Sequence, residues 1–487
     1  MGGAVIRSRG SGVLDAKTHS TGADAMDTMG GEGRPREIAV VGTGISGLAA
    51  AWLLSRRHRV TLYEKDDRVG GHTNTVTLDG PAGAIRVDTG FIVYNDRNYP
   101  NLVALFDHLG VASTATEMSF SASLDGGQFE YSGSGLGGLL AQPVNALRPR
   151  MWAMLRDLMR FYRDAPMALQ DARAADWTLG AYLTANGYGE PFVRDHLLPM
   201  GAAIWSTPAE DMLDYPLTTF VRFCDNHGLL SLGARPQWRT VIGGSQQYVE
   251  RLIAPFRDRI RLNTAVTAIH RDKNGVRIED RQGGARDYDQ VVIAAHADQA
   301  LAMLADADAA ERRLLGAFRY ERNLAVLHSD PVLMPRARRA WAAWNFLSRG
   351  HGDRQKVCVS YWMNRLQHLS DAPPLFVTLN PVQRPAQGLI HRTFLYQHPV
   401  YDRAAIGAQR LLWNLQGARR TWFCGSYFGH GFHEDGLQAG LAVAEQLGGV
   451  ERPWRVPEPN GRIHCHRPGA AAAPLGPGAE LPGAEAA

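Results

Sequence analysis

The most constraining feature of this sequence is the segment from Glu37 to Glu64, which reads EIAVVGTGISGLAAAWLLSRRHRVTLYE. An apolar run typical of a buried strand leads into the glycines Gly42, Gly44 and Gly47, after which a helical run and a second strand follow. These glycines allow a tight turn, a close approach of backbone to phosphate, and packing of the helix on the strand. The order therefore predicts a β-α-β unit that binds a dinucleotide pyrophosphate at the N-terminus of its helix.

The second strand ends in Glu64, 22 residues after Gly42. A carboxylate at this place accepts hydrogen bonds from both ribose hydroxyls of a dinucleotide and repels a 2′-phosphate, which disfavours NADP. We also expect Ile45 and Ser46, in the first turn of the helix, and Lys65, which follows the acid, to contact the nucleotide. An ordinary glycine turn without a ligand is the simpler alternative, but it leaves the register of strand, helix and acid unexplained.

Four further blocks resemble the flavin-containing amine oxidase and phytoene desaturase superfamily. They are EKDDRVGGH from Glu64, VDTGFIVYN from Val87, VIGG from Val241, and TWFCGSYFGHGFHEDGLQAG from Thr421. The chain most resembles the bacterial FAD-dependent, amine-oxidase-like proteins with an FHEDG closing motif, and the resemblance runs from about residue 37 to 448. It implies non-covalent FAD and places these residues against it: Arg68, Gly70, Gly71, His72, Thr89, Gly90, Val266, Gly425, Asp435, Gly436 and Leu437. Most amine oxidases have an acid after the loop glycine, where this chain has Ser426.

The predicted fold class is α/β, with a Rossmann-like FAD-binding domain assembled from separate segments and an α+β substrate domain. We assign residues 36–115, 235–304 and 414–450 to the FAD-binding domain, and residues 116–234 and 305–413 to the substrate domain. A hairpin is expected around Asn274 and Gly275. Residues 1–35 and 451–487 are expected to be a disordered leader and tail, and Met26 and Met29 are alternative starts.

Composition excludes several classes of protein. With 52 basic against 48 acidic residues, the net charge of +4 is too dilute for a nucleic-acid-binding surface. The four cysteines lie far apart, and His72, His430 and His433 lack metal-ligand spacing, so we predict no metal. No apolar stretch reaches the 18 or more residues of a membrane span, and no secretory signal is evident, so we expect a cytoplasmic protein.

The reacting substrate is predicted to be a small, hydrophobic molecule. Amine oxidases of the resembling superfamily usually place a lysine near flavin N5, and Lys356 is the one lysine here in a suitable segment, at a turn that enters a strand. The aromatic and methionine content of the substrate domain instead suits an acyl chain, so we favour desaturation or dehydrogenation of a lipid, with an unknown electron acceptor. Candidate catalytic residues are His430, His433 and Tyr361; Trp362, His398 and Tyr427 are also expected near the flavin.

Residues 144–166 interleave arginines with aromatic, leucine and methionine side chains. Such a helix can lie at an anionic membrane surface, here the inner membrane, or can simply pack in a domain with a solvated arginine face. Four functions remain open: a lipid desaturase or dehydrogenase, an amine oxidase that forms an imine and hydrogen peroxide, a fatty acid isomerase, and a flavin-bearing partner protein without activity.

Overall fold

The computed structural model of the protein describes residues 34–81, 83–171, 177–205, 210–230, 233, 235–350 and 356–466. Contacts divide the chain into two compact units, residues 1–35 and 36–487. All but two residues of the predicted leader lie outside the described part, so its disorder stays a prediction. Contacts do not divide residues 36–487 further, and the two-domain assignment also stays a prediction.

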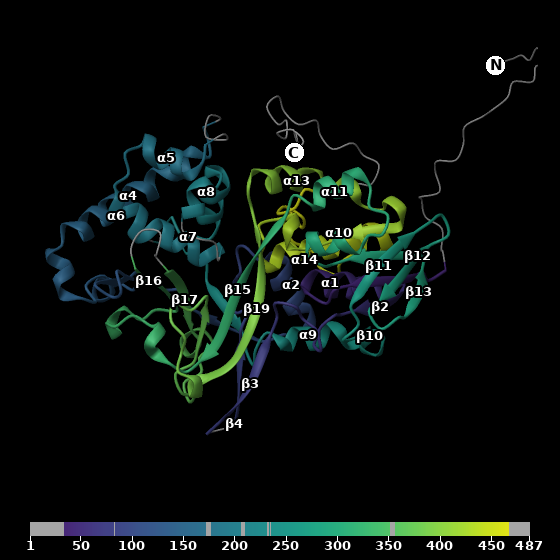
Figure 1. Ribbon diagram of the computed structural model, residues 1–487, viewed down its shortest axis with the longest axis horizontal. Helices are drawn as coiled ribbons and strands as arrows, with labels where there is room; N and C mark the ends of the chain where they lie inside the picture. Colours follow the sequence, from purple (N-terminus) through teal and green to yellow (C-terminus); the bar gives the residue numbers. More distant parts are fainter. Residues whose placement is uncertain are drawn as a thin grey trace, which may run out of the picture. The chain divides into compact units, whose positions relative to one another are not determined.

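The predicted β-α-β unit forms the centre of a five-stranded parallel sheet (Figure 1). Its strands, in spatial order, are β10 (Ile260–Arg261), β2 (Arg59–Tyr63), β1 (Glu37–Val41), β14 (Gln290–Ile293) and β20 (Thr421–Phe423). Because segments up to about 250 residues apart in sequence, such as β1 and β14, supply adjacent strands of this Rossmann-like sheet, its carboxyl edge collects loops from the whole chain.

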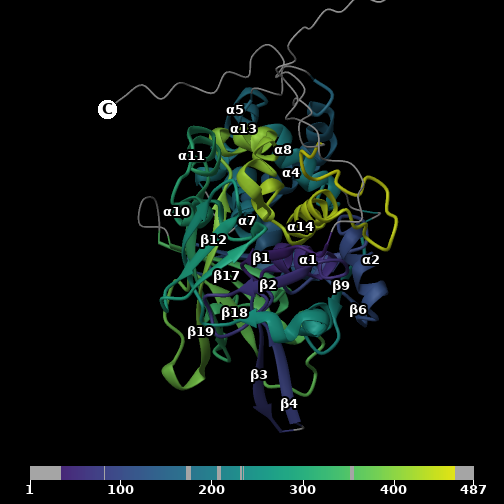
Figure 2. The ribbon, with the colours of Figure 1, turned by 90° about the vertical axis from the view of Figure 1, so that its right-hand side faces the viewer.

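Helix α1 (Ile45–Leu54) is buried along its whole length, which fits its sequence of alanine, leucine and isoleucine on every face. It lies beside α14 (His433–Gly448), and Figures 1 and 2 both show the two helices together. A Cβ on Gly440 would lie 2.2 Å from the Ser46 carbonyl oxygen, so glycine allows this close approach. Helices α9 (Gln246–Ile253) and α2 (Pro100–Leu109) complete the helical layer.

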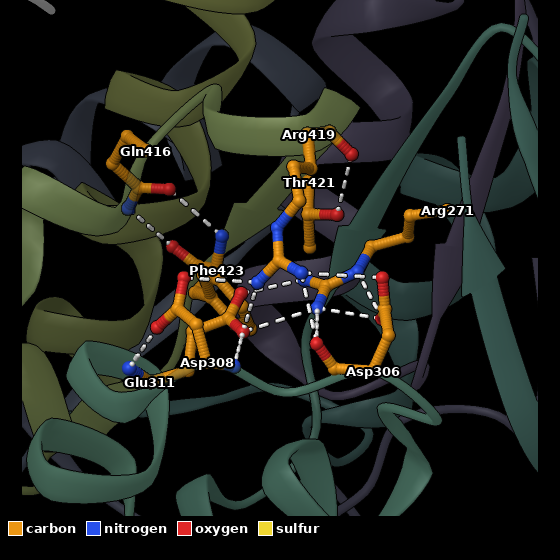
Figure 3. Close-up of polar contacts among 8 residues, drawn as sticks. All are labelled: Arg271, Asp306, Asp308, Glu311, Gln416, Arg419, Thr421 and Phe423. Carbon is orange, nitrogen blue, oxygen red and sulfur yellow. Dashed lines mark hydrogen bonds and ion pairs between the residues drawn. The ribbon is translucent and has the colours of Figure 1, made fainter. Parts of the chain in front are cut away.

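The predicted hairpin around Asn274 is confirmed. It joins β11 (Val266–Arg271) to β12 (Val276–Asp280), and β13 (Ala285–Tyr288) completes a three-stranded antiparallel sheet. Helices α10 (Ala297–Met303) and α11 (Ala309–Leu315) follow β14. A cluster of charged side chains links β11 to α11 and to the segment before β20 (Figure 3).

Figure 3 also shows how the outer edge of β20 is protected. The Gln416 side chain donates to the Phe423 carbonyl at 2.7 Å and accepts from the Phe423 N–H at 2.8 Å. A side-chain amide thus takes the place of a neighbouring strand, and the edge presents no free ladder to another chain.

A second, seven-stranded sheet has the order β19-β15-β18-β17-β16-β7-β8. Its strands are β7 (Phe120–Leu124), β8 (Phe129–Ser132), β15 (Arg319–His328), β16 (Trp344–Arg349), β17 (Lys356–Trp362), β18 (Phe376–Leu379) and β19 (Ile390–Val400). One face packs an apolar core that includes Met151 and Met154 of helix α4 (Pro149–Ala168). There are also two small sheets. In one, β3 (Thr75–Gly80) pairs with β4 (Gly83–Asp88); in the other, β9 (Trp238–Val241) pairs with both β5 (Tyr94–Asn95) and β6 (Ser113–Thr116).

The helices between β8 and β9 gather at the left of Figure 1, away from β11–β13. They are α3 (Leu136–Leu139), α4 (Pro149–Ala168), α5 (Leu179–Ala185), α6 (Glu190–Phe192), α7 (Leu198–Trp205) and α8 (Leu217–Asn226). Helices α12 (Met363–Leu366) and α13 (Arg403–Leu412) belong to later segments. Within the described residues, no helix is both long and apolar enough to cross a bilayer.

The prediction of a disordered tail from residue 451 is wrong for residues 451–466. Arg452 binds Glu445 and Asn101, the indole of Trp454 stacks on Trp52, and Arg462 binds Asp435. The low-complexity composition begins only after these residues, so the predicted disordered tail started too early in the sequence. Residues 467–487 lie outside the described part.

Candidate functional site

The glycine-rich turn between β1 and α1 is held by the predicted ribose-binding acid. The Glu64 carboxylate is buried and accepts hydrogen bonds from the Thr43 backbone N–H at 3.0 Å and from the Thr43 hydroxyl. Its other oxygen accepts from the Asp66 N–H at 3.0 Å. Glu64 therefore fixes the conformation of the turn, and the oxygen that binds the Asp66 N–H keeps capacity for one further donor, as a ribose hydroxyl would supply.

The three glycines of the turn differ in what surrounds them. A Cβ on Gly42 would lie 2.7 Å from the Ala294 carbonyl oxygen, and a Cβ on Gly47 would lie 2.0 Å from the Gly42 carbonyl oxygen. A Cβ on Gly44 would meet no protein atom within 4 Å. Packing of the protein thus explains glycine at the first and third positions, and the space above Gly44 is left for a ligand.

The N-terminus of α1 has the chemistry that a pyrophosphate requires. No side chain caps it, and its first turn, which contains Ile45 and Ser46, holds no acidic residue. The unsatisfied N–H groups and the positive end of the helix dipole favour an anion here. The residues present fit the nucleotide of the prediction.

The second predicted glycine pair folds over the first turn. The Gly70 N–H donates to the Thr43 carbonyl at 3.0 Å, and a Cβ on Gly71 would lie 3.0 Å from Gly44 Cα. Arg68 donates to the carbonyls of Gly71 at 2.8 Å and Thr73 at 3.2 Å. Arg68 therefore holds the Gly70-Gly71 loop in its conformation over the first turn.

The closing block lies against the same turn, because a Cβ on Gly436 would lie 3.0 Å from the Ile45 side chain. Its two acids have structural partners. Both oxygens of Asp435 bind the Arg462 guanidinium, and one accepts from the Phe432 N–H at 2.7 Å. Glu434 accepts the N–H groups of Asn101 and Leu102 and so caps α2. These contacts favour capping over direct contact with the cofactor for both carboxylates.

The remaining predicted cofactor residues are distributed around this edge. Thr89 donates from its N–H to the Asn74 carbonyl, and Gly90 packs against the His72 carbonyl. Val266 begins β11, two residues after Thr264, whose N–H binds the Glu64 carbonyl. Three others complete the set: Lys65 is exposed beside Glu64, Gly425 follows β20, and Leu437 is buried in α14.

Four histidines from separate segments converge beside the Gly70-Gly71 loop. We call them the histidine group: His72, His296, His398 and His433. The ring of His72 lies 5.3 Å from that of His398 and stacks at 5.1 Å on Tyr396. His433 stacks at 3.9 Å on Phe91 and shares a 2.6 Å hydrogen bond with the Tyr248 hydroxyl. The buried Nε2 of His72 has no hydrogen-bond partner among the described residues, which fits a polar ligand group at this point.

The histidine group is uncharged near neutral pH. Burial lowers the pKa of His72 to about 4, and burial, with a smaller effect of His72, lowers the pKa of His296, His398 and His433 to about 3. A protonated imidazole here has no carboxylate bonded to it in the structure to offset its desolvation. These side chains therefore act as neutral hydrogen-bonding groups.

This neutrality predicts a loss of stability in mild acid. Between pH 6.5, the ordinary pKa of histidine, and about pH 4, the unfolded chain binds protons that the folded chain does not bind. The free energy of unfolding should therefore fall as the pH falls, by about 1.4 kcal/mol per pH unit for each histidine. Urea unfolding at pH 7 and pH 5.5 measures the effect. His398→Gln should make the dependence shallower by about one proton, and an unchanged dependence in this variant would contradict the assignment.

The three predicted catalytic residues do not lie together. His433 belongs to the histidine group, whereas His430 lines a cavity of about 470 Å³ between α8 and α13, with Tyr215, Arg222 and Arg410. Tyr361 lies in the apolar core of the seven-stranded sheet, with its ring 5.2 Å from Trp344, and burial raises the pKa of its hydroxyl. The structure thus places His433 and the additional candidate His398 beside the predicted cofactor loops, and His430 in a separate cavity.

Sequence reasoning missed His296, Tyr396 and Tyr248. His296 follows the strand that ends at Ile293, and the carboxyl ends of parallel strands carry ligand-binding residues. Tyr396 is two residues from His398 on β19, so the alternation of a strand places both on one face. These two signals were available in the sequence, whereas the position of Tyr248 depends on how α9 packs.

Comparison with known proteins gives the following matches. Residues 45–326 match the family described as flavin containing amine oxidoreductase. The Mycobacterium tuberculosis protein AofH, assigned as a flavin-containing monoamine oxidase, is 29% identical over 262 residues, which make up 51% of this chain and 54% of AofH. The chain thus matches about half the length of this curated relative.

Two solved structures show the same fold. A putrescine oxidase with bound putrescine superposes with a TM-score of 0.62 at 15% identity, covering 85% of this chain and 99% of that one. A fatty acid isomerase of P. acnes that produces CLA has a TM-score of 0.57 at 16% identity, covering 84% and 97%. At these identities the similarity concerns the fold alone.

Proposed function

This chain belongs to the flavin-containing amine oxidoreductase family and is an FAD-dependent oxidoreductase, and from that premise we propose that it dehydrogenates an uncharged, hydrophobic substrate. We infer a fatty acyl chain of a lipid as the substrate class. When bound, FAD supplies a hydride acceptor. The residues of the chain supply the pyrophosphate turn, an uncharged polar group of histidines, and an apolar surface.

The observation that carries this proposal is that the histidine group is neutral and that the described residues place no free carboxylate beside it. Among the residues that the structure describes, all the lysines (Lys65, Lys273 and Lys356) are exposed, and the buried imidazoles are neutral. The nearby Asp88 accepts hydrogen bonds from Thr75, Ser245 and Gln367, and burial raises its pKa to about 6. A polyamine cation would therefore find no free carboxylate to offset its loss of water.

An apolar core adjoins the histidine group. Tyr396 stacks on His72 and also packs in the core of the seven-stranded sheet. Tyr361 belongs to the same core, together with Ala325 and Val377. We propose that this side of the site receives the acyl chain, and that the two hydroxyls of Tyr396 and Tyr248 and the imidazole of His433 orient the reacting end. The free Nε2 of His72 is available to hydrogen-bond a polar group of the substrate or the cofactor.

A product analysis tests this proposal. The holoenzyme is incubated with bacterial phospholipid and a dye as electron acceptor, and the acyl chains are then analysed by mass spectrometry. We expect chains that have lost two hydrogen atoms, with dye reduced in equal amount. Lys356→Met should retain this activity because Lys356 is exposed at the start of β17.

Other results of the same experiment would replace the proposal. Peroxide release from a polyamine but not from lipid, with loss of activity in Lys356→Met, would identify an amine oxidase. A rearranged acyl chain of unchanged mass, formed without dye reduction, would identify an isomerase. A holoprotein that processes neither substrate class would support a partner protein without activity.

A further inference from the structure

The outward face of helix α4 carries large apolar side chains where a solvated helix carries polar ones. Its inward face buries Met151, Met154, Phe161 and Ala165. The opposite face repeats at helical spacing and is exposed; it consists of Trp152, Arg156, Met159, Arg163 and Met167. Of these, Trp152 is 57%, Met159 49% and Met167 67% exposed. The helix is therefore apolar on both faces, and only one of them has a partner.

The apolar surface extends beyond α4. Half of the twelve large hydrophobic side chains that are exposed among the described residues fall between residues 136 and 167; they are Leu136, Val144, Leu147, Trp152, Met159 and Met167. The Trp152 indole donates to the Ala146 carbonyl at 2.9 Å, which fixes it against the segment that carries Val144 and Leu147. We call these six residues with Arg156 and Arg163 the docking face. Isolated exposed apolar residues are common, but such a concentration marks an interaction site.

The segment that carries most of the docking face contains more arginine than acid. Residues 144–166 contain five arginines and two aspartates. Asp157 is buried and accepts from Gly189 as well as from Arg156, and Asp164 binds Arg163. Arg150, also on α4, binds Asp125 and Asp195 of neighbouring segments, and Arg194 binds Glu190. Each of these acids is thus paired with an arginine, but the side chains of Arg156 and Arg163 stay 74% and 73% exposed, at the same surface as the apolar side chains.

We propose that the docking face binds the surface of an anionic lipid bilayer, with α4 parallel to the membrane plane. Tryptophan and methionine side chains enter the boundary between head groups and acyl chains, and the arginines contact the lipid phosphates. The exposed guanidinium groups of Arg156 and Arg163 flank these apolar side chains, so their apolar stems can lie along the interface while the charged groups reach the phosphates. Binding at this face is independent of the reaction catalysed.

Sedimentation with lipid vesicles tests the proposal, using the FAD-loaded full chain. Vesicles of phosphatidylcholine with phosphatidylglycerol should bind the protein, and vesicles of phosphatidylcholine alone should bind it much more weakly. Trp152→Ser with Met159→Ser should weaken binding about tenfold or more, because apolar side chains leave the interface. Arg156→Gln with Arg163→Gln should weaken it about fivefold for each arginine, and only when phosphatidylglycerol is present.

Leu395→Ser provides a matched control, since Leu395 on β19 is 59% exposed but lies outside the docking face. It should bind vesicles as the wild type does. Equal loss of binding in this control, or no binding of the wild type to anionic vesicles, would overturn the proposal. Self-association that Trp152→Ser abolishes, without vesicle binding, would show that the face joins two copies of the chain. Thermal unfolding of each variant confirms that it is folded.

Discussion

Gly44→Ala should remove FAD binding and leave the fold intact, whereas Gly47→Ala should damage the fold itself. The Cβ added at Gly44 meets no protein atom within 4 Å, and the backbone there, with φ of −66° and ψ of 176°, suits alanine. The free energy of unfolding of the apoprotein should therefore change by less than about 0.5 kcal/mol. The same methyl group would occupy the space of the pyrophosphate, so FAD affinity should fall about tenfold or more.

The comparison with Gly47 makes this result informative. Its added Cβ would lie 2.0 Å from the Gly42 carbonyl oxygen, inside the turn, and should cost about 3 kcal/mol or more. The absorbance of bound flavin per protein and the urea unfolding of the apoprotein measure the two effects separately. Normal FAD content in folded Gly44→Ala would show that the nucleotide does not lie against this turn.

The second large effect is expected at the charged cluster of Figure 3. The side chain of Arg271 is fully buried and binds Glu311 at 3.0 Å and Asp306 at 2.8 Å. Arg419 also reaches Glu311, at 2.6 Å, so one carboxylate serves two guanidinium groups. Arg271→Met would leave the buried Glu311 carboxylate without the guanidinium group of Arg271, and should destabilise the protein by about 3 kcal/mol.

An ion pair on the same small sheet serves as the control. Arg277 binds Asp287 between β12 and β13, and both side chains are mostly exposed. Arg277→Met should leave the midpoint of urea unfolding almost unchanged, because water screens such pairs. Equal destabilisation by the two substitutions would contradict the role of burial in the cluster.

The part of the fold that follows from local sequence pattern could be predicted. The order of strand, glycine turn, helix and strand from Glu37 to Glu64 requires a parallel pair, and the Asn274-Gly275 turn requires a hairpin. The assembly of the parallel sheet from distant segments came from the resemblance, because nothing local in the sequence places β20 beside β14. Both strands carry buried apolar residues on each face, as strands in a parallel sheet covered on both sides do.

The candidate site was less predictable, because it depends on where elements begin and end. His430 and His433 are three residues apart, but α14 begins at His433, so one lies in the loop that faces α8 and α13 and the other packs on Phe91. Glu434 likewise caps a helix that begins more than 300 residues earlier. Such contacts follow from tertiary packing, and neither residue spacing nor composition contains them.

The most direct test of the central claim is the visible absorption of the protein under anaerobic conditions. The flavin band is recorded before and after addition of bacterial phospholipid, with a polyamine mixture in a parallel sample. The neutral histidine group, without a free carboxylate beside it, predicts that lipid bleaches the band and that polyamine does not. Bleaching by polyamine alone would contradict the proposed substrate class, and the lack of any flavin band after addition of FAD would contradict the nucleotide site itself.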